Sequence, residues 1–174
     1  MRTILTVALL LAAFLLAGCS GDAPKDAPRP VGAASDPISP KPDTPLPDRA
    51  LKAELTLAEP LTTLKPGEKK TIKVKVKNAS DVLWIVHGTG EGSKYRVAVG
   101  NSWLDSKGQL VTNMDGRYGL PLNLAPGRDV EVPLAITAPA QPGDYILELD
   151  IVQEGVAWFK DKGSEVLKVN VKVQ

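Results

Sequence analysis

Hydrophobic and polar residues alternate along most of the chain from residue 53 onward. In the clearest stretch, Ile72, Val74 and Val76 are separated by lysines. A period of two is typical of a β-strand that turns one face toward a core and the other toward water. The same alternation predicts further strands at residues 53–57, 95–103, 130–136, 145–151 and 167–173, with a short apolar run at 82–86.

Turn signals separate these strands, and no stretch shows a sustained helical period with end caps. Pro-Gly pairs follow residues 65, 125 and 141, and Asp105–Gly108 is typical of a hairpin turn. Pro133 indicates an edge strand or a bulge, and Glu154-Gly155 indicates a bulge. Residues 113–122 are expected to be irregular. The pattern predicts an all-β fold, an immunoglobulin-like antiparallel β-sandwich of seven to eight strands. With a single cysteine in the chain, this sandwich is expected to lack a disulfide.

Two features of the strand region each allow two interpretations. The lysines between Ile72 and Val76 form either a basic binding strip or a solvated face, and the solvated face or a protected edge is favoured. The glycines at 88–92 suggest a phosphate loop, but the G-x-x-x-x-G-K pattern and a following helix are missing. A loop that connects strands is therefore favoured for this segment.

The N-terminus carries a secretion signal. Arg2 precedes an apolar run from Ile4 to Leu15, which is too short for a membrane-spanning helix. The tetrapeptide Leu16–Cys19 resembles the lipobox of bacterial lipoproteins, and the resemblance implies that the Cys19 thiol is diacylated before cleavage. The alternative is an ordinary signal peptide, or an uncleaved helix, with an incidental cysteine, but a lone cysteine in a secreted chain then needs a partner or stays a free thiol.

Position 20 bears on the membrane to which such an anchor would be sorted. By resemblance to the enteric sorting rule, an Asp after the cysteine would indicate retention in the inner membrane, and this chain has Ser20. The expected location is therefore the cell envelope, lipid-anchored at Cys19, in the outer membrane facing the periplasm.

A proline-rich segment separates the anchor from the strands. Residues 20–48 hold eight of the fifteen prolines and only three large apolar residues. Such a composition does not bury enough surface to offset the entropy of ordering, and it favours an extended spacer. The predicted organisation is residues 1–18 as signal peptide, 19–48 as lipidated cysteine and disordered tether, and 49–174 as the sandwich.

Charge and cysteine content exclude several function classes. One of the 21 basic residues, Arg2, lies in the signal peptide, which leaves 20 basic against 20 acidic residues. This balance argues against a nucleic-acid binder. Acylation of Cys19 leaves no thiol for a metal site, and His87 has no second histidine as a partner. No metal and no cofactor are expected.

Part of the predicted domain resembles a known module. The segments VAVGNSWLD, GLPLNLAPG, APAQPGDYILELDIVQEGVAWF and DKG lie between Val97 and Gly163. They resemble a β-sandwich module appended to surface-polysaccharide glycosyltransferases and to the ATPase subunits of polysaccharide exporters. The resemblance implies glycan recognition or assembly, without catalysis. This chain departs from that context, because it carries no enzyme or ATPase and has the lipobox-like anchor.

Candidate binding residues lie around two of the predicted hairpins. A flat aromatic face stacks on a sugar ring, and nearby carboxylate, amide and guanidinium groups bond its hydroxyls. The residues that fit are Trp103, Asp115, Arg117, Tyr118, Glu154, Trp158 and Phe159.

The tryptophans also fit a core, because a sandwich without a disulfide needs large buried side chains. For Trp84 and Trp103 the core is favoured. Trp158 and Phe159 are adjacent, and adjacent residues of a strand face opposite sides. One of these two is therefore expected to be exposed or to lie under a loop.

Three function classes follow from these observations. The first is a non-enzymatic, lipid-anchored envelope module that binds surface glycan or a partner protein. The second is a structural accessory subunit of an envelope secretion or assembly complex, docked through an edge strand. An enzyme is not expected, because no H-E-x-x-H or G-x-S-x-G motif occurs, although aspartates and glutamates leave a carboxylate pair open.

Overall fold

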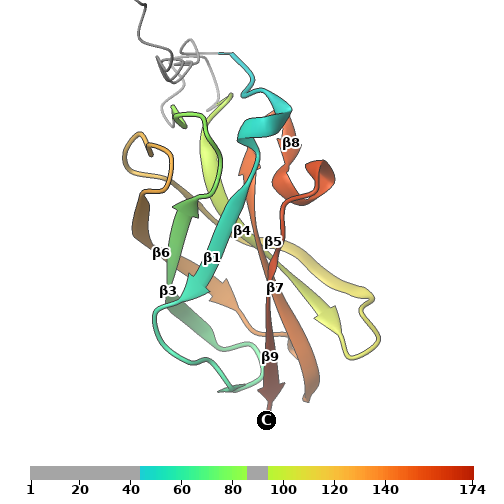
Figure 1. Ribbon diagram of the computed structural model, residues 1–174. Coiled ribbons are helices and arrows are strands. Elements are labelled where there is room, and N and C mark those ends of the chain that lie inside the picture. Colours follow the sequence, from blue (N-terminus) through green and yellow to red (C-terminus); the bar gives the residue numbers. More distant parts are fainter. Residues whose placement is uncertain (1–43, 86–93) are drawn as a thin grey trace, which may run out of the picture. The chain divides into compact units, whose positions relative to one another are not determined.

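The computed structural model describes residues 44–85 and 94–174, and these fold as two β-sheets (Figure 1). The three-stranded sheet has the order β1-β3-β6, and the six-stranded sheet has the order β2-β9-β7-β4-β5, with β8 pairing to β7. The strands are β1 (Ala53–Leu57), β2 (Thr63–Leu64), β3 (Lys69–Asn78), β4 (Val97–Asp105), β5 (Leu110–Gly119), β6 (Asp129–Thr137), β7 (Gly143–Gln153), β8 (Ala157–Trp158) and β9 (Leu167–Val173). Within the described residues, the short 3₁₀ helix η1 (Asp48–Ala50) precedes β1, and the short 3₁₀ helix η3 (Phe159–Lys162) follows β8.

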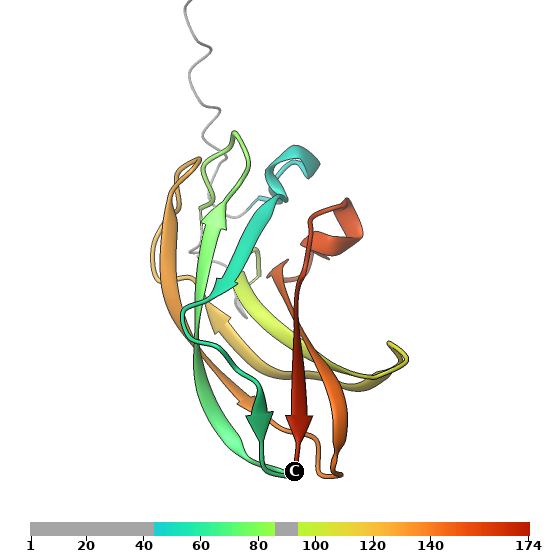
Figure 2. The same ribbon diagram turned by 60° about the horizontal axis from the view of Figure 1, so that its bottom comes forward.

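The two sheets form an immunoglobulin-like β-sandwich, which confirms the predicted fold class. Figure 2 shows the three-stranded sheet and the β7–β9 side of the other sheet as separate layers. All strand pairs are antiparallel except β2 with β9. The core between the layers contains Trp84, Trp103, Phe159 and the inward aliphatic residues of β3, β6 and β7.

The β3 strand has the predicted alternation. Ile72, Val74 and Val76 are buried, and the lysines between them face solvent. The strand lies in the centre of its sheet, so its lysines do not protect an edge. These lysines and the following Lys77 form ion pairs with acidic residues of the neighbouring strands: Lys73 with Glu131 (3.4 Å), Lys75 with Asp129 (3.3 Å) and Lys77 with Glu54 (2.8 Å). These pairs favour the interpretation of the lysine row as a neutralised, solvated face.

The predicted hairpin at Asp105–Gly108 and the edge position of Pro133 are both confirmed. Gly108 donates to the Asp105 carbonyl at 2.9 Å, and Pro133 lies on β6, which ends the three-stranded sheet. The expectation of an irregular segment at 113–122 is wrong for residues 113–119, because β5 runs through Gly119, and it holds only for residues 120–122. This strand ends the six-stranded sheet and has both faces largely in solvent, so its sequence does not alternate.

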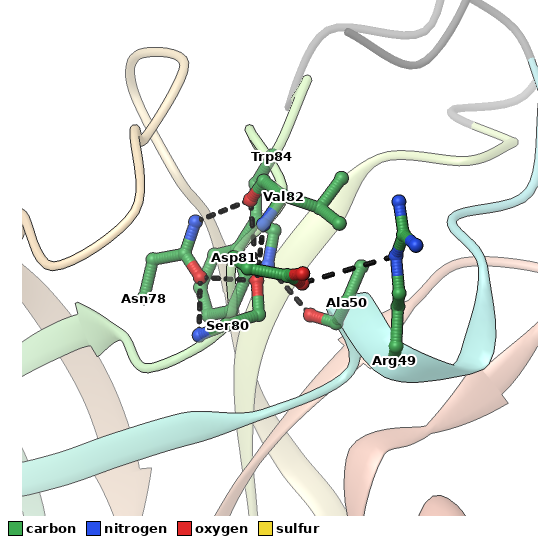
Figure 3. Close-up of polar contacts among 7 residues, drawn as sticks. All are labelled: Arg49, Ala50, Asn78, Ser80, Asp81, Val82 and Trp84. Carbon is green, nitrogen blue, oxygen red and sulfur yellow. Dashed lines mark hydrogen bonds and ion pairs between the residues drawn. The ribbon is translucent and has the colours of Figure 1, made fainter. Parts of the chain in front are cut away.

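A buried polar network secures the connection after β3 (Figure 3). The Asn78 side-chain amide donates to the carbonyls of Val82 and Leu124 at 2.8 Å each, while its oxygen accepts two hydrogen bonds from Ser80. The Trp84 indole donates to the Ala50 carbonyl at 2.7 Å. Trp84 is fully buried, as predicted, and it joins this connection to η1.

The folded part begins earlier than the predicted boundary at residue 49. Leu46, assigned from the sequence to the tether, is 4% exposed, and its amide donates to the Gln153 side chain of β7 at 2.8 Å. One buried leucine among prolines gives no periodic signal, which explains the difference. The predicted signal peptide, Cys19, the predicted tether up to residue 43 and the segment around His87 lie outside the described residues. The described ranges contain no helix with the length and apolarity to cross a membrane.

Candidate functional site

The candidate site is a shallow cleft on the outer face of the six-stranded sheet. The cleft has a volume of about 240 Å³ and is lined by Arg96, Ala98, Arg117, Tyr118, Gly119 and Glu154. We call it the β4–β5 cleft. Leu147, Leu149 and Ile151 of β7 point into the core. The intervening residues of β7 therefore point to the outer face, where the cleft lies.

Strand register brings the lining residues together. Gly100 of β4 is paired with Arg117 on one side and with Asp150 of β7 on the other. In the next outward-facing row, Ala98 lies between Gly119 and Val152, and Val152 is paired with Trp158. Directly paired residues share a face of a sheet, so four strands contribute to one surface.

Arg117 is the central side chain of this surface. Its Nη1 lies 2.5 Å from the Glu154 carboxylate, and its guanidinium carbon lies 4.8 Å from the centre of the Trp158 ring. The side chains of Arg117 and Glu154 are 29% and 27% exposed, so their ion pair is less solvated than most surface pairs. The guanidinium is therefore held in one place by a carboxylate and an aromatic ring together.

The Trp158 ring contacts two cationic side chains and does not present a free face for stacking on a ligand. A Cβ atom at Gly100 would lie 2.9 Å from the tip of the indole, so the ring rests directly on the backbone of β4. Arg117 lies over the ring, and the Lys160 ammonium is 6.0 Å from its centre. The half-buried indole thus fixes the positions of two positive charges above the sheet.

Two predicted binding residues belong to the core, which corrects the sequence-based expectation. Trp103 and Phe159 are both 0% exposed. Trp103 faces inward from β4 and packs edge-on against Tyr145, while Phe159 starts η3 and packs edge-on against Trp84 at 5.2 Å. The chain turns inward at η3, so the side chains of Trp158 and Phe159 point in different directions, as expected. Phe159 is the buried one of the two. Neither core residue is available for surface stacking.

Asp115 also differs from the prediction, because its carboxylate is engaged within the fold. One oxygen accepts from the Asn101 side chain of β4 and the other from the Thr137 amide of β6. A Cβ atom at the neighbouring Gly116 would lie 2.0 Å from the Ala135 carbonyl oxygen, so β5 and β6 approach closely here. Asp115 thus links the two sheets and does not line the β4–β5 cleft.

A buried carboxylate lies in the same outward-facing row as Arg117. Asp150 is 3% exposed and accepts hydrogen bonds from the amides of Ile151 (2.7 Å) and Lys160 (3.3 Å). Burial raises the pKa of Asp150 to about 6, against the lowering effect of those two hydrogen bonds. The neighbouring Glu148 forms ion pairs with Lys160 at 2.7 Å and Lys168 at 3.7 Å, and its hydrogen bond raises the pKa of Lys160.

Of the predicted binding residues, the cleft assembles Arg117, Tyr118 and Glu154, with Trp158 beside them. The sequence did not predict Arg96 as a site residue. Its guanidinium occupies the space above Gly119, where a Cβ atom would lie only 1.8 Å from the Arg96 Nε. A glycine inside a strand often marks a close approach by another group, but Gly119 lies in the segment that was expected to be irregular, so this signal was not available from the sequence. Among the described residues, no group of three or more His, Cys, Asp and Glu side chains is placed to hold a metal ion.

Comparison with known proteins gives only distant similarities. No family model matches the chain, and neither does any curated protein. The solved structures that it resembles include the CARDB domain of a Pyrococcus furiosus protein, with 16% identity over 70% of this chain and 95% of that domain and a TM-score of 0.41. A β-glucosidase from Listeria innocua in complex with glucose shares 15% identity over 69% of this chain but 16% of its own length, with a TM-score of 0.39. The sporulation control protein Spo0M from Bacillus subtilis shares 13% identity over 71% of this chain and 49% of its own, also with a TM-score of 0.39. These values are too low to assign a family or a function.

Proposed function

We propose that this protein is a lipid-anchored binding module of the cell envelope, without enzymatic activity. Its anchor is Cys19, which places the sandwich in the periplasm at the outer membrane. Through the β4–β5 cleft the module binds a surface glycan or an envelope partner protein. The lipobox-like Leu16–Cys19 run supports the location, and the sandwich supplies a stable platform for the cleft.

One observation carries the binding proposal. Arg117 lies 37 residues before Glu154 in the sequence, yet it contacts both Glu154 and the nearby Trp158 at the wall of a solvent-open cleft. Guanidinium and carboxylate groups held at fixed positions are what recognition of a polar ligand needs, because little entropy is lost when they bind. A cluster that served only stability would gain little from charges that remain a quarter exposed.

The chemistry at the site also favours binding over catalysis. Asp150 carries the raised pKa, but its carboxylate is 3% exposed and is occupied by two backbone amides. Glu154 is engaged by Arg117. General acid and base groups must reach the substrate, so these two carboxylates serve better as structural and positioning groups.

The test is co-sedimentation of the full-length protein, in mild detergent, with polysaccharide extracted from the envelope of the source cells. Arg117→Gln removes the charge but keeps most of the size, and it should weaken binding by about tenfold or more. Arg128→Gln changes an exposed arginine outside the cleft and serves as the matched control. Wild-type-like binding by the Arg117 variant, or equal loss in both variants, would refute the site.

A second candidate function rests on β5. This strand ends the six-stranded sheet, and its residues Leu110 and Val111 are 60% and 48% exposed. An exposed apolar edge pairs readily with a strand of another protein. In this alternative the protein is a structural accessory subunit of an envelope secretion or assembly complex. Val111→Pro should then abolish co-purification of a partner and leave the binding of polysaccharide unchanged.

A further inference from the structure

The β4–β5 cleft contains two guanidinium groups at neighbouring positions on one face. Arg117 projects from β5 over Gly100, where its Nε lies 3.2 Å from the place of a Cβ atom. Arg96 precedes β4 and lies over Gly119, two residues beyond Arg117 on the same strand face. The two missing side chains at Gly100 and Gly119 allow both cations to lie flat on the sheet.

These two arginines differ in their partners. Arg117 is paired with Glu154 and stacked on Trp158. Arg96 is exposed, and no carboxylate among the described residues forms an ion pair with it. The lining of the cleft therefore carries two positive charges and one negative charge, with the uncompensated charge on Arg96.

The shape of the cleft bears on the kind of ligand. Its lining includes Ala98 and Gly119, which have a methyl group and no side chain, respectively, so it offers no deep apolar pocket for an anchoring protein side chain. Polar groups around such a lining suit the equatorial hydroxyls and ring face of a sugar. A planar carboxylate fits the two parallel N–H groups of a guanidinium, which gives geometric selectivity as well as charge.

We propose that the β4–β5 cleft recognises a carboxylate-bearing sugar, a uronic acid unit of an acidic polysaccharide, with Arg96 pairing with the carboxylate. This inference rests on the proposed function and names its ligand class. Arg117 and Glu154 then bond the sugar hydroxyls, and Trp158 keeps Arg117 in place. The carboxylate supplies the negative charge that none of the described residues provides to Arg96.

The test uses the full-length protein in mild detergent at about 0.15 M salt, where surface charges are screened beyond about 8 Å. The probes are oligosaccharides of galacturonate, alginate and hyaluronate, each as the free acid and as its uncharged methyl ester, and a tetrapeptide of glutamate. Isothermal titration should show at least one free acid binding about tenfold or more tightly than its ester.

Two variants locate the effect. Arg96→Gln should remove the preference for the acid, because it lowers the affinity for the acid far more than the affinity for the ester. Gly119→Ala should do the same without loss of charge, because the new Cβ displaces the Arg96 side chain. Arg128→Gln, outside the cleft, should retain the preference.

The failures of the two proposals are distinguishable. Equal affinity for acids and esters, with loss of both in Arg117→Gln, would overturn the uronic acid assignment and leave the glycan-binding function standing. Binding of the glutamate peptide alone would overturn the sugar and favour a protein partner. Absence of binding to all the acids, the esters and extracted envelope polysaccharide would overturn both the assignment and glycan binding.

Discussion

The indole nitrogen of Trp84 donates a 2.7 Å hydrogen bond to the carbonyl oxygen of Ala50, and both groups are completely buried. This bond joins the segment after β3 to η1, which lies 34 residues earlier in the chain. Trp84→Phe leaves the Ala50 carbonyl without this donor and opens a small cavity. We expect the free energy of unfolding in urea to fall by about 2 to 4 kcal/mol.

Trp103 provides a matched control for that measurement. It is equally buried, but its Nε1 has no hydrogen-bond partner among the described residues. Trp103→Phe therefore loses packing without losing a bond, and it should cost less than Trp84→Phe by roughly 1 to 2 kcal/mol. Equal costs for the two variants would contradict the role assigned to the Trp84 bond.

Substitution of Gly100 tests whether the positions of Trp158 and Arg117 matter for binding, without changing any charged group of the cleft. In Gly100→Ala the new Cβ would lie 2.9 Å from the Trp158 ring and 3.2 Å from the Arg117 Nε, so both side chains must move. We expect a small decrease in melting temperature and a clear loss of affinity for polysaccharide. Ser102→Ala, the next outward-facing position of β4, should keep the affinity. Unchanged affinity in the Gly100 variant would argue against a pre-positioned Arg117.

Asp150 makes stability depend on pH. Its pKa is about 6 in the folded state and 3.8 otherwise, so the folded protein binds the proton more tightly. The contribution of Asp150 to the free energy of unfolding therefore falls as the pH rises from about 4 to about 6, by up to about 3 kcal/mol. Glu148 and Lys160 face the same carboxylate, and Glu148 raises its pKa while Lys160 lowers it.

Asp150→Asn keeps an oxygen acceptor for the Lys160 amide and removes the ionisable proton. The variant should be more stable than the wild type at pH 7 and similar to it at pH 4. Urea unfolding of both proteins across this range measures the difference directly. A difference in stability that stays constant with pH would contradict the effect of burial on Asp150.

The anchor is tested by Cys19→Ala. If Cys19 carries the acyl chains, the wild type partitions into the detergent phase and incorporates labelled palmitate, because two or more chains hold a protein stably at a bilayer. The variant should lose the label and appear as a soluble or uncleaved species. A mature variant that still partitions with membranes would contradict the lipid anchor.

The sandwich could be predicted where one face of a strand is buried and the other is wet. β3 and β9 alternate because a core lies on one side only, and their positions follow from that pattern. β5 could not be predicted in this way. It is exposed on both faces, and its polar residues carry no period.

Part of the candidate site could be predicted from residue types in the sequence, but the contacts of its residues could not. Residue type singled out Arg117, Glu154 and Trp158, since an aromatic face stacks on a sugar ring while guanidinium and carboxylate groups bond its hydroxyls. Their contact depends on strand register, including the irregularity between Gly100 and Ser102, which no local pattern encodes. Arg96 was not predicted, because its guanidinium fits against β5 only where Gly119 has no side chain, and no local pattern around Arg96 shows this.

The most direct test of the proposed site is the fluorescence of Trp158. The other two tryptophans, Trp84 and Trp103, are fully buried, so iodide should quench only the half-buried Trp158 in the folded protein. Iodide quenching of the full-length protein is measured at constant ionic strength, with and without envelope polysaccharide, and Trp158→Phe provides the baseline. Occupation of the β4–β5 cleft predicts that polysaccharide protects Trp158 from iodide in a saturable way. Binding of polysaccharide with unchanged quenching of Trp158 would place the ligand elsewhere and contradict the account.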